Sequence, residues 1–364
     1  MIEAAGDEGG PIEARRLNHR AMIEQRRGEF AASEADLLRA LSIQERALGE
    51  RHPTTASTRD NLGFGYRLAG DYAAAKREHT LALAIEEEAL GPAHPRVAEA
   101  MNNLALVDKE IGDYDEALRL HARALAVWEE AFGADDPGTI NFLSNLSTVH
   151  RRRGAHDEAL RLLQRAIDLQ ERVDPTSPTL AALLNNLAAV QATRGDLEAA
   201  RPLFARALAL KEATVGADDP SVASSLCNLA EVDAERGDLV ASRSLYGRAL
   251  AIYEARLGDA HPSLAYPLTG LARLDLREGR PADATARAER ALALRQAAGS
   301  APEQVAEAQF LAAEARWAAR DDRPRALALA RDALAGYQGA GEAAADDLAA
   351  VAAWLAERDA AATR

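Results

Sequence analysis

A turn glycine recurs through the 364-residue chain at a spacing of 42 residues, and this regularity constrains the fold more than any other feature. The glycines are Gly28, Gly70, Gly112, Gly154, Gly195, Gly237 and Gly279. Asp321 stands in the same register in an eighth copy, and the linker after the fourth turn is one residue short. Self-similarity of this length predicts a solenoid of helical hairpins, in which each copy buries its apolar face only against its neighbours.

The residues before each turn glycine predict the first helix of a hairpin, here called helix A. Proline recurs 17 positions before the glycine, where its fixed φ and missing N–H suit a first helical turn. These prolines are Pro11, Pro53, Pro95, Pro137, Pro178, Pro220 and Pro262. A leucine and a small residue recur at positions −8 and −7, as in Leu104 and Ala105, and predict a buried stripe that lets two helices approach closely.

The residues after the glycine predict a second helix, helix B. A small residue recurs at position +5 and alanine at +12, as in Ala117 and Ala124, with an aliphatic residue three positions later in the first seven copies. Small residues allow tight packing while the aliphatic ones fill the space between hairpins. Several copies end in Leu-Gly or Phe-Gly, as at Phe132-Gly133, which predicts a helix stop with positive φ.

Together these features resemble the tetratricopeptide repeat, in the 42-residue form found in kinesin light chain and in many bacterial proteins. The segment HPRVAEAMNNLALVDKEIGDYDEALRLHARALAVWEEAFGADDP, residues 94–137, matches that form almost throughout. The resemblance implies an all-α, right-handed superhelical solenoid of about eight hairpins over residues 11–337. The first copy departs from the pattern at Arg20 and the eighth at Glu314 and Asp321, as expected for end repeats with one neighbour.

The ends of the chain lie outside the repeats. Residues 1–10 are expected to be a disordered head, and residues 342–359 an amphipathic helix that caps the stack.

The formal charge of −14 argues against general nucleic-acid or anionic-membrane binding. One cysteine, Cys227, excludes an internal disulfide framework, and the chain has neither a long apolar run nor a signal-peptide pattern. The three lysines among 43 basic residues favour a GC-rich, bacterial genome, and a cytoplasmic location is expected.

The sequence predicts no enzyme, no cofactor and no metal. His52, His94 and His261 precede helix-start prolines where other copies have Asp136 and Asp219, which indicates a capping role rather than metal binding. Two other histidines, His79 and His121, occupy position +9 of their copies and are expected in the core. Cys227 has no histidine in register to activate it.

An unbroken series of asparagines occupies position −9, one residue before the core leucine. The series is Asn61, Asn103, Asn145, Asn186 and Asn228. Asparagine is a mediocre helix former, so the series has a cause beyond local propensity. In the tetratricopeptide family the corresponding asparagines line the concave groove and bond the backbone of extended peptides, so the resemblance implies a peptide-binding groove here. The alternative is that they tie one helix A to the next and touch no ligand.

Position −3 is basic in three consecutive copies, at Arg67, Lys109 and Arg151. By the family's geometry these side chains also face the groove, which favours a partner with an acidic segment or a free carboxylate. The alternative is that they are solvated charges that suit a helix C-terminus. The sequence thus predicts a non-enzymatic scaffold that binds a protein or peptide. A regulatory arm of a bacterial signalling ATPase or caspase-like protease system, and a self-assembling homo-oligomer, remain alternatives.

Overall fold

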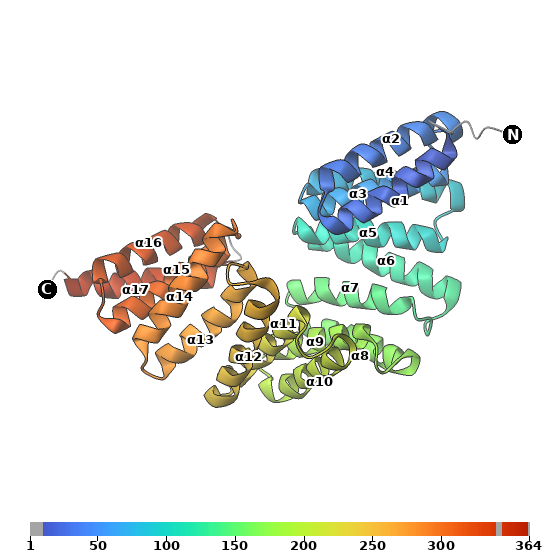
Figure 1. Cartoon of the computed structure of the whole chain (residues 1–364). Helices are drawn as coiled ribbons and strands as arrows, with labels where there is room; N and C mark the ends of the chain where they lie inside the picture. Colours follow the sequence, from blue (N-terminus) through green and yellow to red (C-terminus); the bar gives the residue numbers. More distant parts are fainter. Residues whose placement is uncertain (1–9, 340–343, 363–364) are drawn as a thin grey trace. The chain divides into compact units, whose positions relative to one another are not determined.

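The computed structural model describes residues 10–339 and 344–362, and these form an all-α chain of consecutive hairpins (Figure 1). By its contacts the chain divides into two compact units, Met1–Pro175 and Thr176–Arg364. Within the described ranges there are seventeen α-helices and no strand. The predicted disordered head falls mainly on residues 1–9, which lie outside the described residues.

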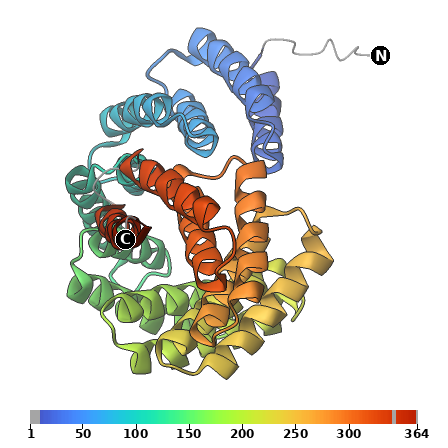
Figure 2. The ribbon, with the colours of Figure 1, turned by 90° about the vertical axis from the view of Figure 1, so that its left-hand side faces the viewer.

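The first unit consists of four hairpins, each made of an odd-numbered helix A and an even-numbered helix B. Its helices are α1 (Pro11–Arg27), α2 (Phe30–Leu48), α3 (Pro53–Ala69), α4 (Tyr72–Leu90), α5 (Pro95–Glu110), α6 (Tyr114–Phe132), α7 (Thr139–Arg152) and α8 (His156–Val173). Within this unit each helix packs against its immediate neighbours in the chain (Figures 1 and 2).

The second unit continues the same alternation. It contains α9 (Pro178–Thr193), α10 (Leu197–Val215), α11 (Pro220–Glu235), α12 (Leu239–Leu257), the 3-10 turn η1 (Pro262–Leu264), α13 (Ala265–Arg277), α14 (Pro281–Ala297), α15 (Pro302–Ala319), α16 (Arg323–Gly339) and α17 (Ala345–Ala362). The last helix packs on α16, and Val351 and Leu355 of α17 are buried there. Residues 340–343, which include the start of the predicted capping segment, lie outside the described residues.

The turn glycines have the backbone conformation that the repeat predicts. In all seven, φ is between +72° and +85°, a region that side chains with a Cβ enter at a cost. At Gly70 the amide N–H donates to the Arg67 carbonyl, and the next amide donates to Tyr66, so the last carbonyls of α3 are satisfied. In the eighth copy the positive φ falls on Arg320 and Asp322 instead, which flank Asp321.

The core consists of the small and aliphatic residues that recur in the sequence. Every residue at position +5 from Ala75 to Ala326 is fully buried, and the alanines at +12 are at most 2% exposed. In the sixth copy Ser242 Oγ at +5 donates to the carbonyl of Ala230 at −7, at 2.7 Å. Small side chains therefore bring helices A and B of one hairpin into close contact.

Two of the seven prolines do not begin an α-helix, contrary to the sequence prediction. Helix α7 begins at Thr139 rather than Pro137, because Asp136 Oδ1 binds both the Gly138 amide and the Trp128 indole N–H. A Cβ at Gly138 would lie 2.4 Å from the Trp128 ring, so the chain passes the indole closely before the helix starts. Pro262 begins the 3-10 turn η1, and α13 follows from Ala265.

Candidate functional site

The histidines before the helix-start prolines cap helices, as the sequence predicts. His52 Nδ1 accepts a hydrogen bond from the Thr54 amide at 3.1 Å, and His94 and His261 make the corresponding bonds. Asp219 accepts from the Ser221 amide at 2.8 Å in the same way. Histidine and aspartate are exchangeable here because each offers an acceptor to the first orphan amides of a helix.

The two histidines at position +9 lie in the core of the first unit. His79 Nδ1 lies 2.6 Å from Asp60 Oδ1, and its ring fills the space above Gly63. His121 is fully buried, neither ring nitrogen has a described partner, and burial lowers the pKa of His121 to about 4. Within the described ranges, no three His, Cys, Asp or Glu side chains gather where they could hold a metal ion.

The asparagines at position −9 link neighbouring A helices. In four of the five, the side-chain amide donates to position −10 of the preceding helix A, 43 residues earlier. The pairs are Asn61–Asn18 at 3.1 Å, Asn103–Asp60 at 2.9 Å, Asn145–Asn102 at 3.0 Å and Asn228–Asn185 at 2.9 Å. The first three pairs lie in the first unit and the last in the second.

These bonds occupy only part of each amide. In the described part of the protein no donor bonds to Oδ1 of the asparagines at −9, and Asn186 has no hydrogen-bond partner for its side chain. All five residues are half-buried. The side chains are therefore held by the neighbouring helix and keep a carbonyl oxygen that can accept a further hydrogen bond.

The basic residues at position −3 lie on α3, α5 and α7 of the first unit. Arg67 packs over the Phe64 ring at 5.2 Å, and Lys109 Nζ lies 3.0 Å from the adjacent Glu110. Arg151 forms no ion pair with a described residue, and burial together with Arg152 lowers the pKa of Arg151. Three side chains, each half-buried, thus follow one register along three successive A helices.

A third row, at position −6, was not singled out by the sequence analysis. In the first unit it consists of Met22, Phe64, Leu106 and Thr148. Positions −9, −6 and −3 are one helical turn apart and lie on the same side of a helix, called here the A-helix face. Phe64 is 43% exposed on this face. The face therefore carries an amide row, a largely apolar row and a basic row.

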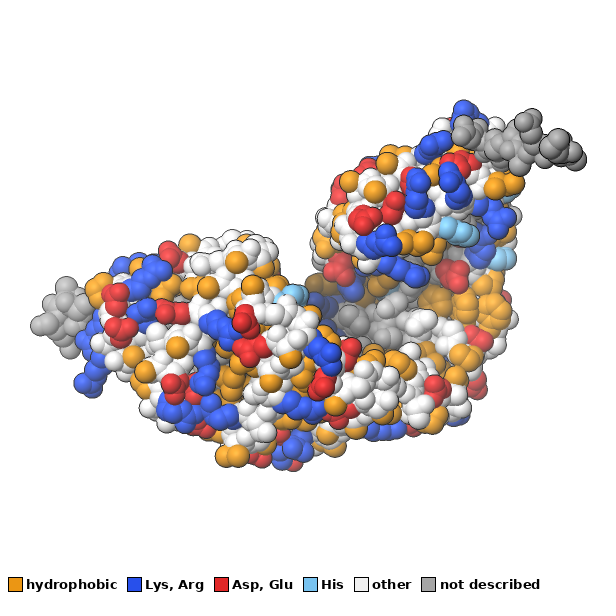
Figure 3. All heavy atoms as spheres, viewed as in Figure 1, with side chains coloured by type: hydrophobic (Ala, Val, Ile, Leu, Met, Phe, Trp, Pro, Cys, Tyr) orange, Lys and Arg blue, Asp and Glu red, His pale blue; other side chains and the backbone are white. Residues whose placement is uncertain are grey.

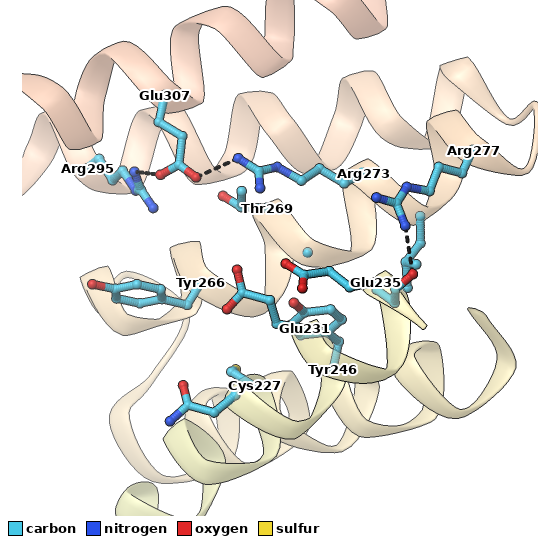
Figure 4. Close-up of a pocket in the computed structure, with 14 residues that line it drawn as sticks. Cys227, Glu231, Glu235, Tyr246, Tyr266, Thr269, Arg273, Arg277, Arg295 and Glu307 are labelled. Carbon is cyan, nitrogen blue, oxygen red and sulfur yellow. Dashed lines mark hydrogen bonds and ion pairs between the residues drawn. The ribbon is translucent and has the colours of Figure 1, made fainter. Parts of the chain in front are cut away.

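In the second unit the A-helix face is hollowed between repeats. One pocket lies between α9 and α11 over Phe204, with Ala189, Ala192 and Glu235 in its walls. A second pocket, of about 240 Å³, lies among α11, α12, α13, α14 and α15. Figure 4 shows this second pocket, with Glu231 and Glu235 on one side and Arg273 and Arg295 meeting at Glu307 on the other. We call it the α11–α13 pocket.

Comparison with known proteins identifies the family. The family model described as tetratricopeptide repeat matches residues 13–88, 66–125, 96–172, 179–255 and 221–297. The chain belongs to the tetratricopeptide repeat family. Members of this family mediate protein and peptide binding and are typically non-catalytic. No curated protein matches the sequence.

Solved structures of other tetratricopeptide repeat proteins share the fold. A kinesin-light-chain-like protein of Podospora anserina with nearly identical repeats is 21% identical, with a TM-score of 0.50 over 56% of this chain and 98% of that chain. BtubC from P. vanneervenii is 20% identical, with a TM-score of 0.53 over 67% of this chain and 92% of its own. The apo quorum sensor NprR from B. thuringiensis is 16% identical, with a TM-score of 0.66 over 92% and 90%.

The surface carries charges of both signs. Acidic and basic side chains are interspersed on the face of the molecule that Figure 3 shows. None of the helices in residues 10–339 and 344–362 combines the length and apolarity that a bilayer-spanning segment requires.

Burial raises the pKa of Cys227 to about 12, which keeps this thiol in its unreactive neutral form.

Proposed function

We propose that the A-helix face of the first unit binds an extended, acidic segment of a partner protein. The observation that carries this proposal is the in-register series Arg67, Lys109 and Arg151. Two of its members, Arg67 and Arg151, have no carboxylate partner in the described protein, although carboxylates outnumber basic groups in the sequence by 57 to 43. Cations without a counter-ion on a half-buried face favour an anionic ligand.

The electrostatics of Arg151 support the same partner. Burial and the adjacent Arg152 destabilise its charged form, so a carboxylate brought beside it would relieve that cost. The amide row contributes through Asn61, Asn103 and Asn145, whose Oδ1 atoms can accept hydrogen bonds from a peptide backbone of any sequence. Phe64 and Leu106 offer apolar contact between the two polar rows.

The test is a binding measurement with a defined probe. A fluorescent decapeptide in which Asp and Glu alternate with Gly and Leu is titrated with the full chain, beside the same peptide carrying Asn and Gln. We expect the acidic peptide to bind at least tenfold more tightly, with an affinity that falls as salt rises, because ion contacts are screened. The variant R67Q/K109Q/R151Q should lose this preference.

A charge-matched control separates the face from the net charge. The variant R27Q/R39Q/R46Q also loses three positive charges, but it loses them from α1 and α2. It should bind the acidic peptide as the unmodified chain does. Circular dichroism verifies that both variants are folded. Equal affinity of the two peptides, or equal loss in both variants, would contradict the proposed function.

A further inference from the structure

The α11–α13 pocket holds six charged side chains whose partners are unevenly distributed. Arg273 Nη2 lies 2.8 Å from Glu307 Oε1, and Arg295 Nη1 lies 2.7 Å from Glu307 Oε2. Arg277 Nη1 donates to the Ala234 carbonyl at 2.8 Å. All three arginines therefore have acceptors within the protein. No described cation lies within ion-pair distance of Glu231 or Glu235 on α11.

The free carboxylates share one side of the pocket. Glu231 and Glu235 are four residues apart on α11, one helical turn, so both project from the same side of the helix. Figure 4 shows the Glu231 carboxylate between the rings of Tyr246 and Tyr266. The surrounding pocket walls partly desolvate Glu231, and this, together with the negative charge of Glu235, raises the pKa of Glu231. A cation bound here would relieve both effects.

A second, independent observation points to a ligand. Thr269 lines the pocket and is 6% exposed, and its Oγ1 atom is buried with no hydrogen-bond partner. A buried hydroxyl without a partner costs free energy. Its hydroxyl faces the same space as the two carboxylates (Figure 4). The pocket therefore offers two charged acceptors without a cation, and a buried hydroxyl in its wall lacks a partner.

The asparagine row is interrupted at this pocket. Position −9 of the seventh copy is Gly270, and a Cβ there would lie 2.3 Å from the Tyr246 ring. The ring consequently lies directly against the α13 backbone, at the position where copies two to six carry an asparagine. Tyr246 and Tyr266 give the pocket aromatic surfaces, and aromatic rings attract planar cations. One side of the Tyr266 ring already has the Arg295 guanidinium over it, 5.6 Å from the ring centre.

We infer that the α11–α13 pocket binds the guanidinium group of an arginine side chain presented by a partner peptide. The guanidinium carries five N–H donors in a plane, which suits two carboxylates one helical turn apart, the Thr269 hydroxyl and a tyrosine face. This inference concerns residues of the second unit only and deepens the proposed function by adding a basic determinant to the partner. It uses no residue of the basic row.

The experiment compares two peptides that differ only in charge. Acetyl-Gly-Arg-Gly-amide and acetyl-Gly-citrulline-Gly-amide are titrated into the ¹⁵N-labelled full chain, and amide shifts of α11 and α13 are followed. Citrulline has nearly the shape of arginine and is neutral. We expect the arginine peptide to bind at least tenfold more tightly, and the variant E231Q/E235Q to bind both peptides equally. T269V should weaken the arginine peptide several-fold.

The control variant E303Q/D332N removes two unpaired acidic charges from α15 and α16 of the same unit and should retain the preference for arginine. Equal binding of the two peptides to the unmodified chain would overturn the inference, as would an undiminished arginine preference in folded E231Q/E235Q. Because R67Q/K109Q/R151Q changes only the first unit and E231Q/E235Q only the second, the inference and the proposed function can fail separately.

Discussion

At the scale of single residues, the asparagines at position −9 combine a structural bond with an unused acceptor. The structure shows that the two interpretations of these residues are compatible: the amide nitrogen ties Asn228 to Asn185 while Oδ1 has no described donor. The sequence could predict the row, because it is periodic. It could not predict the partner at position −10, because that residue varies between asparagine and aspartate.

Asn228→Ala should destabilise the second unit more than Asn186→Ala. Both residues stand at position −9 of helices in the same unit, but only Asn228 donates to a neighbouring helix. The gain in helix propensity is the same in both variants and cancels in the comparison. The expected difference in the free energy of unfolding is about 1 kcal/mol, the net value of one hydrogen bond. Denaturant unfolding followed by circular dichroism measures it; equal losses would contradict the structural role.

His121 should make stability depend on pH. Its pKa is lowered from the ordinary 6.5 to about 4 by burial, so the unfolded chain takes up a proton at a pH where the folded chain does not. Stability is therefore full above pH 6.5 and decreases as the pH falls from about 6.5 to about 4, with a slope of up to about 1.4 kcal/mol per pH unit.

His121→Leu should remove this dependence, and leucine suits the site because Leu163 occupies the same position of the next copy. Thermal unfolding at pH 7.5 and pH 5 compares the two proteins. A drop in melting temperature of the same size in both would show that His121 does not titrate as the structure indicates.

At the scale of helices and hairpins, buried aspartates at position −4 join consecutive repeats. Asp233 of α11 pairs with Arg201 of α10 at 2.6 Å, and Asp108 of α5 pairs with Lys76 of α4 at 2.6 Å. The basic partner stands at position +6 of the preceding copy in each case. The sequence analysis did not identify this charge pair. The sequence did contain a signal for this ion pair, because the acidic residue at −4 and the basic residue at +6 recur at fixed positions.

Asp275→Asn should destabilise the second unit by about 2 kcal/mol, since the buried carboxylate loses charge-assisted hydrogen bonds to its arginine partners. Asp275 is fully buried and pairs with Arg243 and Arg280, each at 2.9 Å, and with Arg287. Asp283→Asn is the control: its pair with Arg280 is longer, 3.8 Å, and exposed. Urea unfolding should show less than about 0.5 kcal/mol for the control. Similar losses in both variants would count against a buried pair.

The starts and stops of helices show where sequence prediction succeeded and where it failed. A turn glycine requires a positive φ, a property of one residue, and all seven were predicted. Pro137 and Pro262 were wrong as α-helix starts, and at Pro137 the chain path is decided by a contact outside the local pattern. At Pro137 that contact is the Trp128 indole, which no local pattern around the proline contains.

Arg320→Gly should stabilise the second unit by about 0.5 kcal/mol. Arg320 has a φ of 57°, where a Cβ costs about 1–2 kcal/mol and the greater unfolded-state freedom of glycine offsets part of the gain. Its side chain makes no described ion pair. Gly237→Ala is the reciprocal variant and should destabilise, since its φ is 85°. Melting temperatures measure both changes; a lower value for Arg320→Gly would contradict the backbone argument.

At the scale of the whole molecule, the stabilising contacts join mainly helices that are neighbours in the chain. The bonds between repeats, such as Asn61–Asn18 and Asn228–Asn185, reach 43 positions along the sequence, and within each unit a helix packs mainly on its neighbours in the chain. The fold could be predicted from sequence because it follows from one repeated hairpin. The α11–α13 pocket could not, because its lining comes from side chains of five helices that the repeat pattern treats as interchangeable.

Leu271→Ala should therefore weaken the second unit while leaving most of the first unit unchanged. Leu271 is a core leucine of α13, and such truncations cost about 2–5 kcal/mol. Hydrogen exchange should show lost protection in α11–α15 and little change in α1–α6. Leu104→Ala in α5 should give the converse pattern. Uniform loss of protection over both units would indicate cooperative unfolding of the whole chain.

Gly270 shows how repeats of nearly the same sequence can come to differ in the ligand that they recognise. Repeats that share every position cannot distinguish one ligand from another beyond its length, so discrimination must come from positions where the copies differ. The missing side chain at Gly270 is one such difference: it seats Tyr246 against α13 and leaves the pocket beside it. Comparing tetratricopeptide chains by their departures from the consensus, rather than by their agreement with it, is therefore the more informative way to infer what each one recognises.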